Sequence, residues 1–162
     1  MKTLSYLPLN EQQVAPVVNG LAQLLADLQV YYTNLRGFHW NIKGRGFFTL
    51  HEKFEGLYNE VAEKVDEVAE RILQLDGKPE NKFSEYLKTT NVPEVSNVQC
   101  GGDAVENILQ TLRALMIQER NILALAAEAN DEVTVALMGD YLRGQEKQVW
   151  MLTAFASAAC AD

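Results

Sequence analysis

The stretch HEKFEGLYNEVAEKVDEVAE, residues 51–70, carries two helical patterns at once and therefore decides the fold. The first pattern is apolar and recurs at the steps of three and four residues that define one face of an α-helix; its members are Phe54, Leu57, Tyr58, Val61, Val65, Val68 and Ile72. The run Asp76-Gly77-Lys78-Pro79 is a typical helix stop. The sequence therefore predicts a helix from about Phe47 to Leu75.

The second pattern in this stretch is polar and lies about a third of a turn from the apolar face when residues are spaced ~100° apart. Its members are His51, Glu55, Asn59, Ala62, Asp66 and Glu70. Each end of this line is a pair of metal-ligating residue types four positions apart. The two ends are separated by 19 residues, or about 28 Å of helix at ~1.5 Å per residue. One metal ion therefore cannot be held by both ends of one helix.

A second copy of the chain removes this difficulty. When two such helices lie antiparallel about a two-fold axis, His51 faces the partner's Glu70 and Glu55 faces the partner's Asp66. The axis falls between Asn59 and Ala62, where side chains are small or neutral. The spacing therefore predicts two equivalent sites in a dimer, provided that the helix is continuous over residues 51–70.

Amphipathic patterns predict three more long helices. One begins after Asn10, a candidate N-cap, and weakens near Gly37; another is expected to be capped by Asp103, and the last to begin at the break over residues 130–132. Residues 77–102 form a long connection in which residues 83–88 are expected to be helical. The sequence predicts an all-α, ferritin-like four-helix bundle, with residues 1–162 as one domain.

Composition excludes several classes of protein. The 48% apolar content excludes a disordered chain, and no run approaches the ~18 apolar residues of a membrane span. The formal charge of −8, from 14 basic and 22 acidic residues, argues against nucleic acid as the default partner. Cys100 and Cys160 lack metal-ligand spacing and are interpreted as free thiols in the cytoplasm, with a single disulfide as the alternative.

The only two histidines of the chain flank one predicted turn. His39 stands 12 residues before His51, and Gly44 and Gly46 lie between them. Imidazoles together with carboxylates suit ferrous iron, zinc or manganese. The Glu-x-x-His motif of a metal site inside one bundle is absent, because Arg36 and Phe48 occupy the positions three residues before the histidines.

A structural interpretation of the same residues is the alternative. Both histidines could be hydrogen-bonded structural residues, and the acidic residues of the helix could form a solvated face. The solvated-face interpretation is preferred for Glu52, Glu60, Glu63 and Glu67. Trp40, beside His39, is either a buried aromatic residue or one that lies close to an oxidising metal.

The run Gly37-Phe38-His39-Trp40-Asn41, followed by His51, Asp66 and Glu70 at these spacings, resembles the Dps proteins (DNA-binding proteins from starved cells, or mini-ferritins). The resemblance implies a twelve-subunit shell that oxidises Fe(II) with hydrogen peroxide or dioxygen and stores ferric mineral. It also implies that His39 and His51 of one chain and Asp66 and Glu70 of its partner are iron ligands. The family often has Asp at the position of Glu55, which would assist a second iron.

The expected function is therefore that of a ferroxidase and iron-storage shell that protects against oxidative damage, with iron at the site and zinc as a substitute. Trp40 would quench stray oxidising equivalents. A DNA-compacting shell is the alternative, but residues 1–20 contain Lys2 as their only base. The excess of acidic residues would attract cations. Candidate residues that line a pore are Glu128, Asp131 and Asp140, with a helix cap as the alternative for Asp131.

Overall fold

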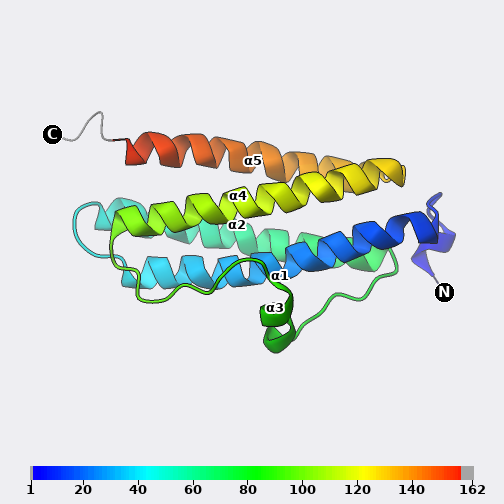
Figure 1. Cartoon of the computed structure of the whole chain (residues 1–162), viewed down its shortest axis with the longest axis horizontal. Helices are drawn as coiled ribbons and strands as arrows, with labels where there is room; N and C mark the ends of the chain where they lie inside the picture. Colours follow the sequence, from blue (N-terminus) through cyan, green and yellow to red (C-terminus); the bar gives the residue numbers. More distant parts are fainter. Residues whose placement is uncertain (1, 158–162) are drawn as a thin grey trace.

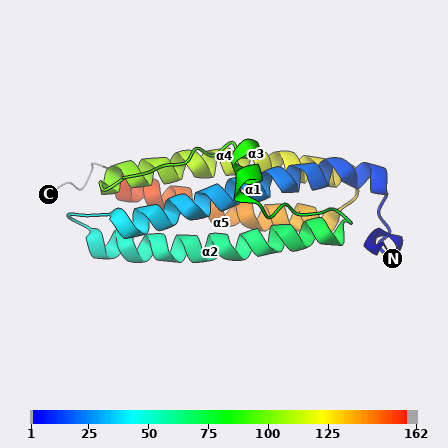
Figure 2. The same ribbon diagram turned by 90° about the horizontal axis from the view of Figure 1, so that it is seen from below.

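The computed structural model describes residues 2–157, which form four long α-helices, one short α-helix and an N-terminal 3-10 helix. The elements are η1 (Thr3–Ser5), α1 (Glu11–Asn41), α2 (Phe47–Gln74), α3 (Phe83–Thr89), α4 (Gly101–Glu128) and α5 (Glu132–Ala156). The long helices lie side by side as a bundle, and α3 packs on α1 halfway along the middle connection (Figure 1 and Figure 2). The predicted four-helix bundle with a helix in its long connection is confirmed.

Helix ends follow local capping chemistry. The Asn10 side chain accepts hydrogen bonds from the backbone N–H groups of Gln12 and Gln13, as expected of an N-cap. The predicted cap at Asp103 is wrong, because α4 begins two residues earlier, at Gly101. A Cβ atom at Gly101 would lie 2.6 Å from the Leu50 side chain, so glycine allows α4 to start against α2.

A tight turn joins α1 to α2. Gly44 and Gly46 have φ angles of 87° and 82°, in the left-handed region that favours glycine. The turn is tied to the start of α4 by a hydrogen bond from the Lys43 N–H to the Gln99 carbonyl at 3.1 Å. Both histidines therefore lie at the same end of the bundle.

The long connection is fixed to α1 by two buried polar side chains. The Asp27 carboxylate accepts hydrogen bonds from the Asn91 N–H at 2.6 Å and the Thr90 hydroxyl at 2.9 Å. The Asn34 amide donates to the Pro93 carbonyl at 2.9 Å. Backbone groups of the connection are thus satisfied by α1, which explains how a segment of mixed polarity takes one path.

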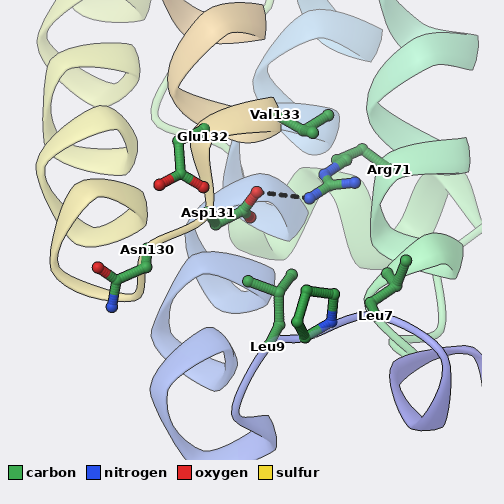
Figure 3. A pocket seen from close by; sticks show the side chains of 8 residues that line it. Leu7, Leu9, Arg71, Asn130, Asp131, Glu132 and Val133 are labelled. Atoms are coloured by element: carbon green, nitrogen blue, oxygen red, sulfur yellow. Dashed lines mark hydrogen bonds and ion pairs between the residues drawn. The ribbon is translucent and has the colours of Figure 1, made fainter.

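A buried ion pair closes the opposite end of the bundle. Arg71, near the end of α2, donates to Asp131 at 2.6 Å (Figure 3). It also donates to the Thr134 hydroxyl at 2.9 Å. Asp131 also caps α5 by accepting from the Thr134 N–H at 3.0 Å. The two charged side chains are 6% and 0% exposed, so the cap interpretation of Asp131 is confirmed.

The other two candidate pore residues are on the surface. Glu128 is exposed at the end of α4, and exposed Asp140 pairs with Arg143 at 2.9 Å.

Cys100 is a free, exposed thiol, whereas Cys160 lies outside the described residues. Within residues 2–157, none of the helices combines the length and the apolar character needed to cross a membrane.

Two of the glutamates assigned to a solvated face are exposed or partly exposed, as expected, and they also accept hydrogen bonds from neighbouring side chains. Glu67 accepts a hydrogen bond from the Tyr141 hydroxyl at 2.7 Å. Glu60 accepts one from Lys64 and one from Gln148, each at 2.7 Å. Helical spacing indicates which residues share a face of α2, but it does not indicate which of them contact α5.

Glu119 is expected to make stability pH-dependent. Burial raises the pKa of Glu119 from 4.5 to about 7, although the Gln145 amide and the Lys64 charge oppose this shift. Between these two pH values the folded chain keeps a proton that the unfolded chain releases, so stability falls as pH rises. Glu119→Gln should remove up to about 3 kcal/mol of the stability difference between pH 5 and pH 8. Denaturant unfolding at both pH values measures it, and equal pH dependence in both proteins would contradict burial as its cause.

Asp76 holds the N-terminal turn. Its carboxylate accepts hydrogen bonds from the Thr3 N–H at 2.8 Å and the Leu4 N–H at 3.0 Å. These bonds, chiefly that of Leu4, lower the pKa of Asp76 below its usual 3.8. The N-terminal turn is therefore fully held by the Asp76 carboxylate above pH 3.8, and this hold is lost as pH falls through the lowered pKa of Asp76.

Hydrogen exchange of the N-terminal peptide, corrected for intrinsic rates, should show this loss of protection in acid. Asp76→Asn keeps an acceptor oxygen but does not titrate, so its protection should stay level across the same pH range. A step of the same size in the variant would assign the effect to another group.

Candidate metal centre

The structure brings the two histidines into direct contact. His39 lies in the last turn of α1 and His51 in the first turns of α2. Their rings are stacked, with centroids 3.7 Å apart and planes 19° apart. Both side chains are half-buried, so the pair is held by the fold and can still be reached from outside the chain.

Reciprocal hydrogen bonds determine which ring nitrogen of each histidine carries the hydrogen. Nδ1 of His39 lies 2.8 Å from the His51 carbonyl oxygen, and Nδ1 of His51 lies 2.9 Å from the His39 carbonyl oxygen. A carbonyl oxygen can only accept, so each Nδ1 carries the hydrogen. In the neutral ring, Nε2 then keeps its lone pair, which is the form that binds a metal ion.

Aromatic rings support the pair on both sides. The Phe47 ring stacks on His51 with centroids 5.1 Å apart, and Tyr58 meets His39 edge-on at 5.4 Å. Burial and the neighbouring Glu55 carboxylate raise the pKa of Tyr58. Tyr58 belongs to the apolar stripe predicted from the sequence, and its place at the site was not predicted, although it stands two helical turns after His51.

The three carboxylates of the predicted centre lie on the exposed side of α2. Glu55 follows His51 by one turn. Asp66 lies 15 residues after His51, about 22 Å away along the axis, and Glu70 about 28 Å away. Helix α2 is continuous across all four positions, as the two-fold arrangement requires.

One chain does not assemble the predicted centre by itself. Among the described residues, no group of three histidine, cysteine or acidic side chains is close enough to hold a metal ion. A single chain instead presents the histidines at one end of α2 and Asp66 with Glu70 at the other. Each end of α2 therefore carries only part of the predicted ligand set.

Trp40 is not a core residue. It follows His39 in the last turn of α1 and is 64% exposed. The Arg36 guanidinium lies 4.6 Å from the centre of its ring, a cation–π contact. The buried-aromatic interpretation of Trp40 is therefore wrong for this chain, and the indole lies on the surface, on the residue that follows His39.

Comparisons with known proteins agree on one family. The model of the ferritin-like domain matches residues 18–159. The DNA protection during starvation protein of Porphyromonas gingivalis is 60% identical over 156 residues, which cover 96% of this chain and 98% of the relative.

Solved structures extend this likeness to the fold. A Dps protein from Vibrio cholerae O1, described as a member of a broad superfamily of ferritin-like diiron-carboxylate proteins, matches with a TM-score of 0.90 and 46% identity, covering 92% of this chain and 94% of that one. Dps from Listeria innocua, soaked with zinc, matches with a TM-score of 0.83 and 32% identity, covering 86% and 94%. The ferritin-like character of the bundle is thereby confirmed.

Proposed function

This chain belongs to the Dps family of ferritin-like proteins, and from that premise we propose that it is a ferroxidase and iron-storage protein. It oxidises Fe(II) with hydrogen peroxide or dioxygen at sites shared between subunits and stores the ferric mineral in a dodecameric shell. The main support for this proposal is the histidine pair, because its reciprocal Nδ1 hydrogen bonds leave both Nε2 atoms available to a metal ion. The protein would protect a starved or oxidatively stressed cell.

The proposed centre takes ligands from two subunits. His39 and His51 come from one, and Asp66 and Glu70 from the partner subunit, as the antiparallel pairing of two α2 helices requires. Glu55 lies one turn from His51 and assists a second iron. Two imidazoles with carboxylates suit ferrous iron, and zinc accepts the same ligand types.

Pairing of two ferrous ions protects the cell. Hydrogen peroxide takes one electron from each Fe(II), its O–O bond breaks, and with two protons both oxygen atoms leave as water. Neither oxygen is released as hydroxyl radical. Trp40, exposed beside His39, would give up an electron to an oxidant that escapes this two-electron step.

The negative charge suits a shell that draws in cations. With 22 acidic against 14 basic residues, the chain would make the interior and entry paths of a shell attractive to Fe(II). We take residues 1–162 as one domain that acts in the cytoplasm as a dodecamer built from two-fold dimers.

DNA compaction is the second candidate function, considered because the Porphyromonas gingivalis relative is named for DNA protection during starvation. Residues 1–20 oppose it, because Lys2 is their only base and its ammonium is paired with Glu11 at 2.6 Å. DNA compaction predicts retarded DNA mobility at physiological salt. Iron storage alone predicts no retardation.

The direct test adds Fe(II) to the protein without oxygen, then hydrogen peroxide, and follows ferric absorbance with a hydroxyl-radical trap present. We expect oxidation well above the buffer rate, little trapped radical, and the mass of a dodecamer by light scattering. Oxidation at the buffer rate, or a stable monomer, would overturn the proposed function.

A further inference from the structure

Polar side chains from all four long helices meet in the middle of the bundle, away from the histidine pair. Tyr31 of α1, Lys64 of α2, Glu119 of α4 and Gln145 of α5 are 2%, 8%, 0% and 1% exposed. A narrow cavity of about 10 Å³ lies between α1, α2, α4 and α5, and its polar lining residues are Tyr31, Glu60, Lys64, Gln145 and Gln148. We call these five residues and Glu119 the central cluster.

The only cation of the central cluster is Lys64. Its ammonium donates to Glu60 at 2.7 Å and lies 5.1 Å from the centre of the Tyr141 ring. Glu119 accepts a hydrogen bond from Gln145 at 2.5 Å. Burial raises its pKa, and the Lys64 charge opposes that shift only in part. The ammonium of Lys64 is thus paired with one carboxylate, that of Glu60, and acts on Glu119 through its charge alone.

Three buried atoms of the central cluster have no hydrogen-bond partner in the described part of the chain. They are the Tyr31 hydroxyl, Oε2 of Glu119 and Oε1 of Gln145. Two of the three are acceptor oxygens, and buried polar atoms without partners are costly. These two oxygens accept no hydrogen bond from the described part of the chain, so each could bind a cation at the bundle centre.

Ferritin-like bundles that hold metals internally have a glutamate on each of two helices and Glu-x-x-His on the other two. Here Glu60 and Glu119 supply carboxylates from α2 and α4, but α5 supplies the amides of Gln145 and Gln148. Both histidines lie at the bundle end. The residues present do not fit a metal pair, and the Lys64 ammonium is already paired with one of the two carboxylates.

We propose that Lys64 is a built-in counter-ion that excludes divalent cations from the bundle centre, and that neutralising it exposes a latent site formed by Glu60, Glu119 and Gln145. The ammonium holds Glu60 and repels a second cation. Without it, the Glu60 carboxylate and the Gln145 amide line the small cavity with no cation beside them, and Glu119 is joined to Gln145 by a hydrogen bond. Carboxylate and amide oxygens are a ligand set that suits Mn(II). Lys64 thereby restricts metal binding to the outside of the bundle.

The test uses the full chain with His39→Ala and His51→Ala as the parent, so that it is independent of the proposed interface centre. Lys64→Met is added to this parent, and Lys53→Met, on the same helix but outside the cavity lining, is the matched control. Bound Mn(II) is counted from the loss of the free-ion electron paramagnetic resonance signal. High ionic strength suppresses binding to surface carboxylates.

We expect Lys64→Met to bind one more Mn(II) per chain than the parent, and Mn(II) to raise its unfolding temperature. Lys53→Met should match the parent, and adding Glu119→Gln to Lys64→Met should remove the extra site. No extra Mn(II), or extra Mn(II) that survives Glu119→Gln, would overturn the proposal. If the Lys64→Met chain does not assemble, Lys64→Gln is tested in its place. If neither variant assembles, the proposal is also overturned, because the bundle then requires the ammonium itself for folding.

Discussion

Shells assembled from an equal mixture of His39→Ala and Asp66→Ala chains should recover about a quarter of the native ferroxidase sites, whereas shells of either variant alone should oxidise iron at the buffer rate. Each two-fold pair of chains has two proposed sites, and each site takes its histidines from one chain and Asp66 with Glu70 from the other. Every site in a pure variant shell therefore lacks one ligand.

A mixed pair behaves differently. One of its sites carries both substitutions, and the other carries neither. Random pairing makes about half of the pairs mixed, and each mixed pair has one intact site, which gives the expected quarter. A centre built within one chain would recover nothing, because every chain in the mixture is defective.

The measurement is the initial rate of ferric absorbance after peroxide is added to shells reassembled from dissociated subunits. A mixture of His39→Ala with His51→Ala is the matched control. Both substitutions then affect the same half of the site, so no pairing restores it and the rate should remain that of buffer. Recovery in both mixtures, or in neither, would contradict the shared centre.

The fold could be predicted in outline because its main signals are local. Asn10 caps α1 as expected, and the apolar stripe of residues 54–72 gave α2 within a residue at its end. The convergence of His39 and His51 followed from their place on either side of a turn rich in glycine. Their stacking and reciprocal Nδ1 bonds depend on the exact path of that turn, which residue spacing does not specify.

The buried charges were not predictable, because a charge pattern on a helix is the same whether the face meets solvent or a neighbour. Lys64 stands among the acidic residues of the predicted solvated face, yet it is 8% exposed and α5 packs beside it. Glu119 and Arg71 stand within amphipathic helices where a charged residue ordinarily lies outside. Their burial comes from the rotation of whole helices, which is fixed by contacts between distant parts of the chain.

Arg71→Met should be among the most destabilising substitutions in the chain, at about 3–5 kcal/mol. It leaves the Asp131 carboxylate buried at the bundle end without its positive partner. Asp131→Asn should cost a similar amount by stranding the Arg71 guanidinium. The asparagine keeps an acceptor for the Thr134 N–H, so loss of the helix cap does not contribute.

The double variant should be less destabilised than the two single variants added together, because it leaves neither charge buried alone. Denaturant unfolding of all four proteins gives this coupling free energy. The exposed pair Asp140 and Arg143, with side chains 66% and 82% exposed, provides the control, since removing its charges should change stability little. Strictly additive losses at Arg71 and Asp131 would mean that each residue acts through separate contacts, such as those of Arg71 with Gln74 and Thr134, and that the buried ion pair itself does not hold α2 to the α4–α5 turn.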